Sequence, residues 1–163
     1  MCGLPAHAFV FCCFNNAYKI MPAVFERWCA LLHAVPDSVL WLYEANPQAT
    51  DNLLREAQQR GIDPGRIFFA PFVAQDKHLA RLAAADLFLD TLPYNAHTTA
   101  SDALWAGLPV LTCLGASFAG RVAASLLRAA GLPELVATSL ADYEALAFAL
   151  ATTPGRLAAL RAG

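Results

Sequence analysis

Short runs of apolar residues alternate along this chain with longer segments whose apolar positions recur at helical spacing. The short runs are rich in β-branched and aromatic residues and predict strands, while the longer segments predict helices. The expected strands are Ala8–Phe14, Ser38–Tyr43, Arg66–Ala70, Leu87–Asp90, Pro109–Cys113 and Leu135–Ala137. The expected helices are Pro22–Ala34, Pro47–Arg60, Lys77–Ala84, Thr98–Trp105, Gly120–Ala130, Leu140–Thr152 and Gly155–Arg161.

This regular alternation indicates βαβ units, and therefore an α/β fold with a parallel, doubly wound sheet. The strands are almost continuously apolar, which is typical of a sheet with helices on both faces. In such folds ligands bind at the carboxyl ends of the strands. That rule selects four loops, which also hold the unusual polar clusters of the chain: Asn15–Lys19, Pro71–His78, Thr91–Thr99 and Leu114–Gly120.

Composition narrows the class of protein. The 163 residues suffice for one domain with a real core. Hydrophobic residues make up 58% of the chain, but no uncharged apolar run approaches the ~20 residues that span a bilayer, so we expect no membrane partner. The net charge of −2 offers no basic surface for nucleic acid. Five cysteines without zinc-ligand spacing, and no evident signal peptide, favour free thiols, no metal site and a cytoplasmic protein.

Residues 95–107 carry the most informative chemistry. Thr98 and Thr99 open a helical pattern after a turn, and a helix start offers free backbone N–H groups to an anion. Their hydroxyls and His97 would add donors there, although a threonine cap beside an incidental histidine explains the pattern equally well. Asp102, one turn later, could accept hydrogen bonds from a sugar. Together these residues suggest a binding site for the pyrophosphate and ribose of a nucleotide.

Other polar residues near the ligand edge allow two interpretations each. Lys19 would neutralise a phosphate or an anionic leaving group, or it is a solvated loop lysine. His78 and Arg81 share one helix face and would contact a nucleobase, or they simply face water. Asp90 ends a strand, where capping of the following turn accounts for it better than general-base catalysis.

Four motifs, in order and at consistent spacing, resemble the carboxyl-terminal lobe of the O-linked N-acetylglucosamine transferases. These enzymes form glycosyltransferase family 41 and include SPINDLY-like members. The motifs are Phe11–Ile20, Pro36–Leu42, Asn95–Val110 and Arg121–Ser125. The resemblance implies the GT-B fold, in which two Rossmann-like lobes enclose the active site. It implies that residues 1–163 form one such lobe, which binds the nucleotide sugar.

The resemblance also implies a reaction: inverting, metal-independent transfer of a sugar, usually from UDP-N-acetylglucosamine, to Ser or Thr of a protein acceptor, without a cofactor. Lys19 matches the catalytic lysine that contacts the diphosphate and supports departure of the leaving group. The other implied UDP-sugar residues are Asn16 near the phosphate and sugar, the Val73 backbone beside the base, His78 and Arg81 at the uracil, His97, Thr98 and Thr99 at the phosphate, and Asp102 at the ribose.

Parts of the family pattern have no counterpart in this sequence. The amino-terminal lobe, the tetratricopeptide repeats that hold protein acceptors and the final helices are absent, so we expect a fragment with half of an active site. Gln75 stands where animal enzymes have a lysine, and Ala100 replaces a glycine. Both differences bear on which donor sugar is bound and on its affinity. The alternatives are a relative that transfers glucose or fucose or modifies Asn, and a non-catalytic nucleotide-binding remnant.

Overall fold

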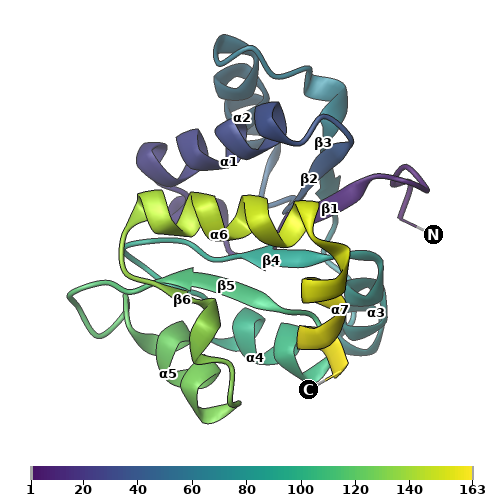
Figure 1. Cartoon of the computed structure of the whole chain (residues 1–163). Coiled ribbons are helices and arrows are strands. Elements are labelled where there is room, and N and C mark those ends of the chain that lie inside the picture. Colours follow the sequence, from purple (N-terminus) through teal and green to yellow (C-terminus); the bar gives the residue numbers. More distant parts are fainter. Residues whose placement is uncertain (1, 163) are drawn as a thin grey trace.

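Six parallel strands form one sheet in the order β3–β2–β1–β4–β5–β6 in the computed structural model, which describes residues 2–162 (Figure 1). The strands are β1 (Phe9–Cys13), β2 (Ser38–Tyr43), β3 (Ile67–Ala70), β4 (Leu87–Leu89), β5 (Val110–Cys113) and β6 (Val136–Ala137). The helices are α1 (Pro22–Ala34), α2 (Pro47–Gln59), α3 (Gln75–Arg81), α4 (Thr98–Trp105), α5 (Val122–Ala129), α6 (Leu140–Thr152) and α7 (Pro154–Ala162). Short 3-10 turns are η1 (Ala17–Lys19), η2 (Pro64–Arg66), η3 (Leu82–Ala84) and η4 (Pro133–Leu135).

The strand order reverses between β1 and β4, which lie side by side in the middle of the sheet. Cys12 of β1 is in register with both Trp41 of β2 and Phe88 of β4. Because the chain leaves β1 and β4 toward opposite edges of the sheet, their carboxyl ends open a crevice, the usual ligand position in such folds. The predicted doubly wound parallel sheet is confirmed.

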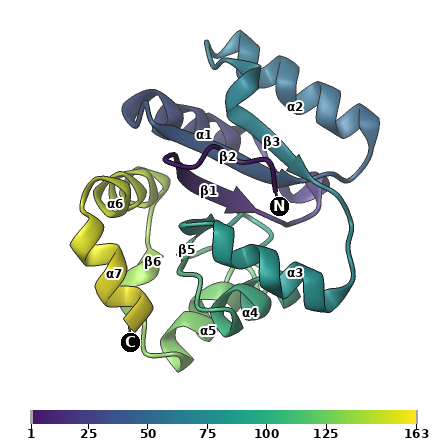
Figure 2. The ribbon, with the colours of Figure 1, turned by 90° about the vertical axis from the view of Figure 1, so that its right-hand side faces the viewer.

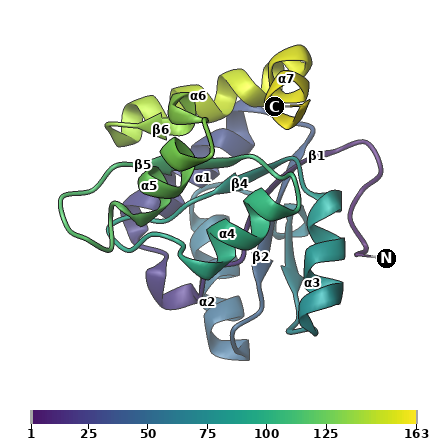
Figure 3. The same ribbon diagram turned by 90° about the horizontal axis from the view of Figure 1, so that it is seen from below.

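Helices cover both faces of the sheet. Figure 2 shows α1 and α2 on one side of β1, β2 and β3, and α3, α4 and α5 on the other side. After β6 the chain returns as α6, which packs against α1 (Figure 1). Seen from below, α3 and α4 lie on the same face of the sheet (Figure 3).

The sheet is buried on both faces, as its continuous apolar runs predict. Every residue of β4 and β5 is buried, and so is every residue of β1 after Phe9. Cys12, Cys13, Cys29 and Cys113 are buried free thiols, as expected, whereas Cys2 is exposed. None of the helices within residues 2–162 combines the length and the apolarity needed to cross a membrane.

The sequence misplaces several element ends. The helix expected from Lys77 begins earlier, at Gln75, and its last residues, 82–84, form η3. The Ala74 side chain makes no capping hydrogen bond, so the start of α3 carries no sequence signal. The segment expected to be only a loop after β1 contains η1, a single turn closed by the Lys19 N–H on the Asn16 carbonyl at 3.0 Å. Such a turn has no hydrophobic period to reveal it.

Candidate functional site

Lys19 links the two loops that meet at the reversal of strand order. It follows β1 through η1, and its Nζ lies 4.1 Å from the centroid of the Tyr94 ring. The same Nζ is 3.4 Å from the carbonyl oxygen of Asn95, in the loop after β4. Burial lowers the pKa of Lys19, and the nearby Asp90 opposes that shift. A partly buried positive charge therefore sits between the two loops.

The start of α4 is open to an acceptor. His97 occupies the N-cap position, and no side chain within residues 2–162 caps this helix. The starts of α1, α3 and α5 also lack a side-chain cap, whereas Asn46 caps α2 and Ser139 caps α6. The backbone N–H groups of the first turn are therefore left for another partner. His97 stacks on Tyr94 with ring centroids 5.2 Å apart, and its buried Nε2 has no hydrogen-bond partner in the described chain. An anion bound at this helix start would provide a partner both for the free N–H groups and for the His97 Nε2.

Three further residues predicted to contact the phosphate lie around this helix start. Thr98 is exposed in the first position of α4, and Asn16 is exposed at the start of η1. Thr99 differs, because its Oγ1 donates to the Oδ1 of Asn15 at 2.6 Å. The Thr99 hydroxyl thus ties α4 to the end of β1.

A buried carboxylate organises the loop after β4. The Oδ1 of Asp90 accepts hydrogen bonds from the backbone N–H groups of Thr91 and Ala96, both at 2.7 Å. Its Oδ2 accepts from the Thr112 hydroxyl at 2.7 Å. Asn15 completes the arrangement by donating to the Thr91 hydroxyl at 2.7 Å. The expectation that Asp90 caps the turn after its strand is confirmed.

The loop before α5 supports the same region from the other side. The Asn95 N–H donates to the carbonyl oxygen of Ala119 at 2.8 Å. A Cβ on Gly120 would lie only 2.9 Å from the carbonyl oxygen of Pro93. Glycine is therefore required for the close approach of the two loops.

Helix α3 carries the two residues expected at the base. The Nε of Arg81 donates to the Nδ1 of His78 at 3.2 Å, which confirms that they share one helix face. Because Nδ1 accepts, the hydrogen of a neutral His78 lies on Nε2. Burial lowers the pKa of His78, and Arg81 lowers it further, while Asp102 opposes the shift. Phe14, directly after β1, meets the His78 ring edge-on with centroids 5.4 Å apart, and its own centroid lies 5.0 Å from the Arg81 guanidinium carbon.

Asp102 joins the base end of the site to the phosphate end. It lies on α4 one turn beyond Thr98, with its Oδ2 3.9 Å from the Nε2 of His78 on α3. Gln75 at the start of α3 donates to its Oδ1 at 3.1 Å. One carboxylate oxygen thus accepts a hydrogen bond from Gln75, and the other faces the His78 imidazole.

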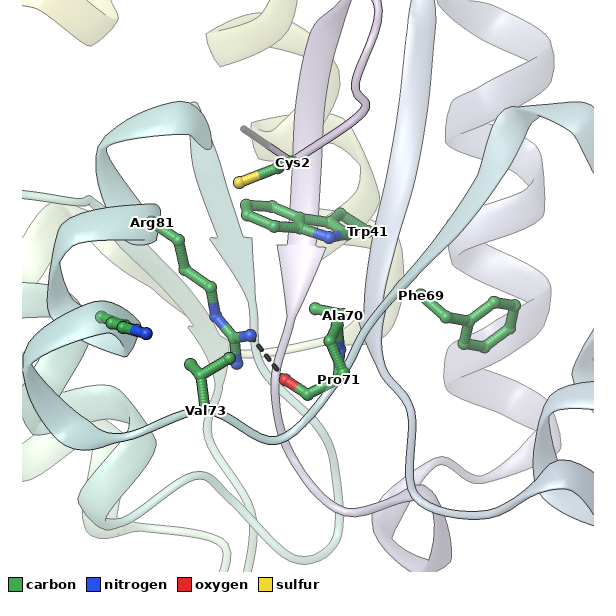
Figure 4. Close-up of a pocket in the computed structure, with 8 residues that line it drawn as sticks. Cys2, Trp41, Phe69, Ala70, Pro71, Val73 and Arg81 are labelled. Carbon is green, nitrogen blue, oxygen red and sulfur yellow. Dashed lines mark hydrogen bonds between the residues drawn. The ribbon is translucent and has the colours of Figure 1, made fainter.

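A pocket of about 370 Å³ lies beside α3 and is lined by Val73 and Arg81 together with Trp41, Pro71 and Lys77, among others. Figure 4 shows the Arg81 side chain reaching the carbonyl oxygen of Pro71, with the Trp41 ring above this contact in the view. The hydrogen bond from the Arg81 Nη1 to that oxygen is 2.6 Å long. The pocket is mainly apolar and bordered by cationic side chains, so it suits a flat heterocycle.

The structure brings the sequence-predicted residues into two groups at one edge of the sheet. Lys19, His97 and Thr98 belong to the first, and His78, Arg81 and Asp102 belong to the second. Their roles toward a ligand stay predictions. Sequence reasoning missed the aromatic contact of Tyr94 and the amide of Asn15, whose only signal is their place in ligand-edge loops. Within residues 2–162 no three His, Cys, Asp or Glu side chains cluster to hold a metal ion.

The family model described as Glycosyl transferase family 41 matches residues 1–163. This chain belongs to glycosyltransferase family 41. The resemblance seen in four motifs is thereby confirmed, and the fold is the Rossmann-like lobe of GT-B glycosyltransferases.

Named relatives cover nearly the whole chain. The UDP-N-acetylglucosamine–peptide N-acetylglucosaminyltransferase of Caenorhabditis elegans is 43% identical over 159 residues, 98% of this chain and 14% of that protein. A probable enzyme of the same name, SEC of Arabidopsis thaliana, is 39% identical over 97% of this chain and 16% of its own length. A solved mutant of the O-GlcNAc transferase of Thermobaculum terrenum superposes with a TM-score of 0.91 at 36% identity, over 99% of this chain and 33% of that chain. The chain thus spans a minor part of its relatives.

Proposed function

We propose that this chain is the donor-binding lobe of a protein O-glycosyltransferase that transfers N-acetylglucosamine from UDP-N-acetylglucosamine to Ser or Thr. The proposal depends above all on the meeting of Lys19 with the uncapped start of α4 at the reversal of strand order. Membership of family 41 and the names of the worm and plant relatives support the donor and the peptide acceptor.

In this proposal the two groups of residues divide the nucleotide between them. The diphosphate lies against the α4 N–H groups, Thr98, His97 and the Lys19 ammonium. The uracil lies between His78 and the pocket beside Arg81 and Val73. The ribose hydroxyls reach the carboxylate of Asp102, which is 3.9 Å from His78. The nucleoside would then extend from α3, at the base, to α4, at the ribose.

The same groups would assist departure of the nucleotide. Negative charge grows on the β-phosphate as the glycosidic bond breaks, and positioned donors that meet this charge lower the barrier. Lys19, His97 and the helix N–H groups are such donors, and the proposal requires neither a metal ion nor a cofactor. The acceptor protein and its proton are assigned to regions outside this lobe. We therefore expect the purified 163-residue chain to bind UDP weakly and to transfer no measurable sugar.

A calorimetric titration with UDP, with GDP as a control nucleotide, tests this proposal. We expect UDP to bind and GDP to bind more weakly. Lys19→Ala should weaken UDP binding at least about tenfold, the scale of one lost charge-assisted hydrogen bond. Arg128→Ala is the matched control, because it removes an exposed positive charge in the last turn of α5. Absence of UDP binding to the wild-type chain, or equal affinity of the two variants, would contradict the proposal.

A further inference from the structure

The Tyr94 ring contacts both side chains that would bring positive charge or a hydrogen-bond donor to the phosphates. The Lys19 Nζ lies 4.1 Å from its centroid. The His97 imidazole stacks on it, with centroids 5.2 Å apart and planes inclined by 26°. Lys19 comes from the loop after β1 and His97 from the start of α4, so the ring joins the two halves of the phosphate site.

The backbone that carries this ring is held firmly. The Tyr94 carbonyl oxygen accepts a hydrogen bond from the Thr91 hydroxyl at 2.6 Å. The peptide groups of Thr91 and Ala96, on either side, donate to the buried Asp90 carboxylate. Buried hydrogen bonds of this kind leave the loop few alternative conformations. The backbone from which the ring projects is therefore fixed, and the ring itself, 40% exposed, contacts Lys19 and His97.

The contact between the Tyr94 ring and the Lys19 ammonium is electrostatically favourable. A ring face attracts an ammonium group, and more strongly where water is partly excluded. The hydrogen bond from Lys19 to Asn95 is long, at 3.4 Å, so it constrains the ammonium only weakly. Burial disfavours the charged lysine and lowers its pKa. The Tyr94 face counteracts this effect by stabilising the charged form in one place.

We propose that Tyr94 is a positioning residue whose ring holds the Lys19 ammonium and the His97 imidazole in the arrangement that receives a nucleoside diphosphate. This inference rests on the proposed function. The ring, and not the phenol hydroxyl, carries the effect, because both contacts are made to the ring.

Titration of the full chain with UDP tests the inference with two substitutions. Tyr94→Phe keeps the ring and should bind UDP as the wild type does. Tyr94→Leu keeps apolar bulk without a ring and should bind roughly threefold to tenfold more weakly, the scale of a cation–π contact. Phe148→Leu is the matched control, since Phe148 on α6 is 42% exposed and Tyr94 is 40% exposed. Tyr94→Met replaces the Leu variant if that variant does not fold.

The pH dependence of UDP affinity separates this role from a merely structural one. Asp90, Cys13, Tyr18, Tyr94 and His97 are the titratable groups around Lys19. The Phe and Leu variants both lack the Tyr94 phenol and retain the other four groups. We expect the alkaline loss of affinity, as Lys19 deprotonates, to begin at lower pH in the Leu variant than in the Phe variant.

The possible results separate the two proposals. A wild-type chain that binds no UDP overturns the proposed function and this inference with it. If the wild type binds UDP but the Phe and Leu variants share one affinity and one pH profile, only the role of Tyr94 is overturned. A Phe variant as weak as the Leu variant also overturns it, because the hydroxyl would then carry the effect.

Discussion

At the scale of single residues, Asp90 has the most unusual environment. Its side chain is 2% exposed, and burial raises its pKa to about 6 although Ala96, Thr112, Thr91 and Asn15 all donate hydrogen bonds that oppose the shift. A carboxyl in the unfolded chain titrates near 3.8. The folded protein therefore binds this proton more tightly than the unfolded chain does.

The titration of Asp90 should appear in the stability of the protein. Its contribution to the free energy of unfolding is fully present below about pH 4 and is lost as the pH rises to about 6. Asp90→Asn cannot titrate, so the difference in free energy of unfolding between the variant and the wild type should move in favour of the variant over this interval and then level off. Urea unfolding of both proteins at a series of pH values measures this difference. A difference that does not vary with pH would refute the assignment.

At the scale of secondary-structure elements, Tyr143 connects α6 to the loop after β4 through a hydrogen bond to Asp90. The Trp28 Nε1 of α1 donates to the Tyr143 hydroxyl at 2.9 Å, and this hydroxyl donates to the Asp90 carbonyl oxygen at 2.8 Å. Trp28 and Tyr143 are both fully buried. One hydroxyl therefore satisfies a buried donor and a buried acceptor on two different elements.

Tyr143→Phe should lower the free energy of unfolding by about 1–3 kcal/mol, because it leaves the Trp28 N–H and the Asp90 carbonyl unpaired in the core. Equilibrium urea unfolding measures the loss. Tyr43→Phe serves as the control, since the partly buried Tyr43 hydroxyl makes no hydrogen bond to any residue that the structure describes. A Tyr143→Phe variant as stable as the control would show that the two bonds add nothing.

The elements themselves could largely be predicted from the sequence. The bounds of α1, β2, α4 and α6 agree with the expected ranges, because Pro22 opens α1, Ser139 caps α6 and apolar runs mark the strands. The start of α3 could not be predicted, because Ala74 at its N-cap supplies no capping side chain that would mark it. Gln75 forms part of that start by bonding to Asp102, 27 positions along the chain.

The site was predictable only as separate loops. The rule for strand ends selected the loop of Lys19 and the loop of His97, but no local pattern says which strands are neighbours. The order of the sheet, with β1 beside β4, sets the contact of Lys19 with Tyr94. The same order explains why the links made by Asn15 were missed, since its partners lie 75 or more positions away.

At the scale of the whole molecule, the proposed ligand contacts elements from both halves of the sheet. Lys19 follows β1, His78 lies on α3 and Asp102 lies on α4. A nucleotide that binds the folded chain and not the unfolded chain must stabilise the entire domain.

We therefore expect UDP to raise the urea midpoint of unfolding of the wild-type chain. At a concentration of one hundred times its Kd the gain in free energy should be about 2.7 kcal/mol. Lys19→Ala at the same UDP concentration should gain less, while its stability without UDP stays close to that of the wild type. An equal gain for both proteins would place the nucleotide away from Lys19.

The hydroxyl that joins Trp28, Tyr143 and Asp90 has one more consequence. Asp90 is bonded in turn through its side chain to Asn15, and Asn15 to Thr99 in the first turn of α4. Buried and half-buried polar groups therefore connect α1 and α6 to the start of α4. We therefore expect Tyr143→Phe on α6 to perturb the loop after β4 that carries the proposed nucleotide site, as well as the core.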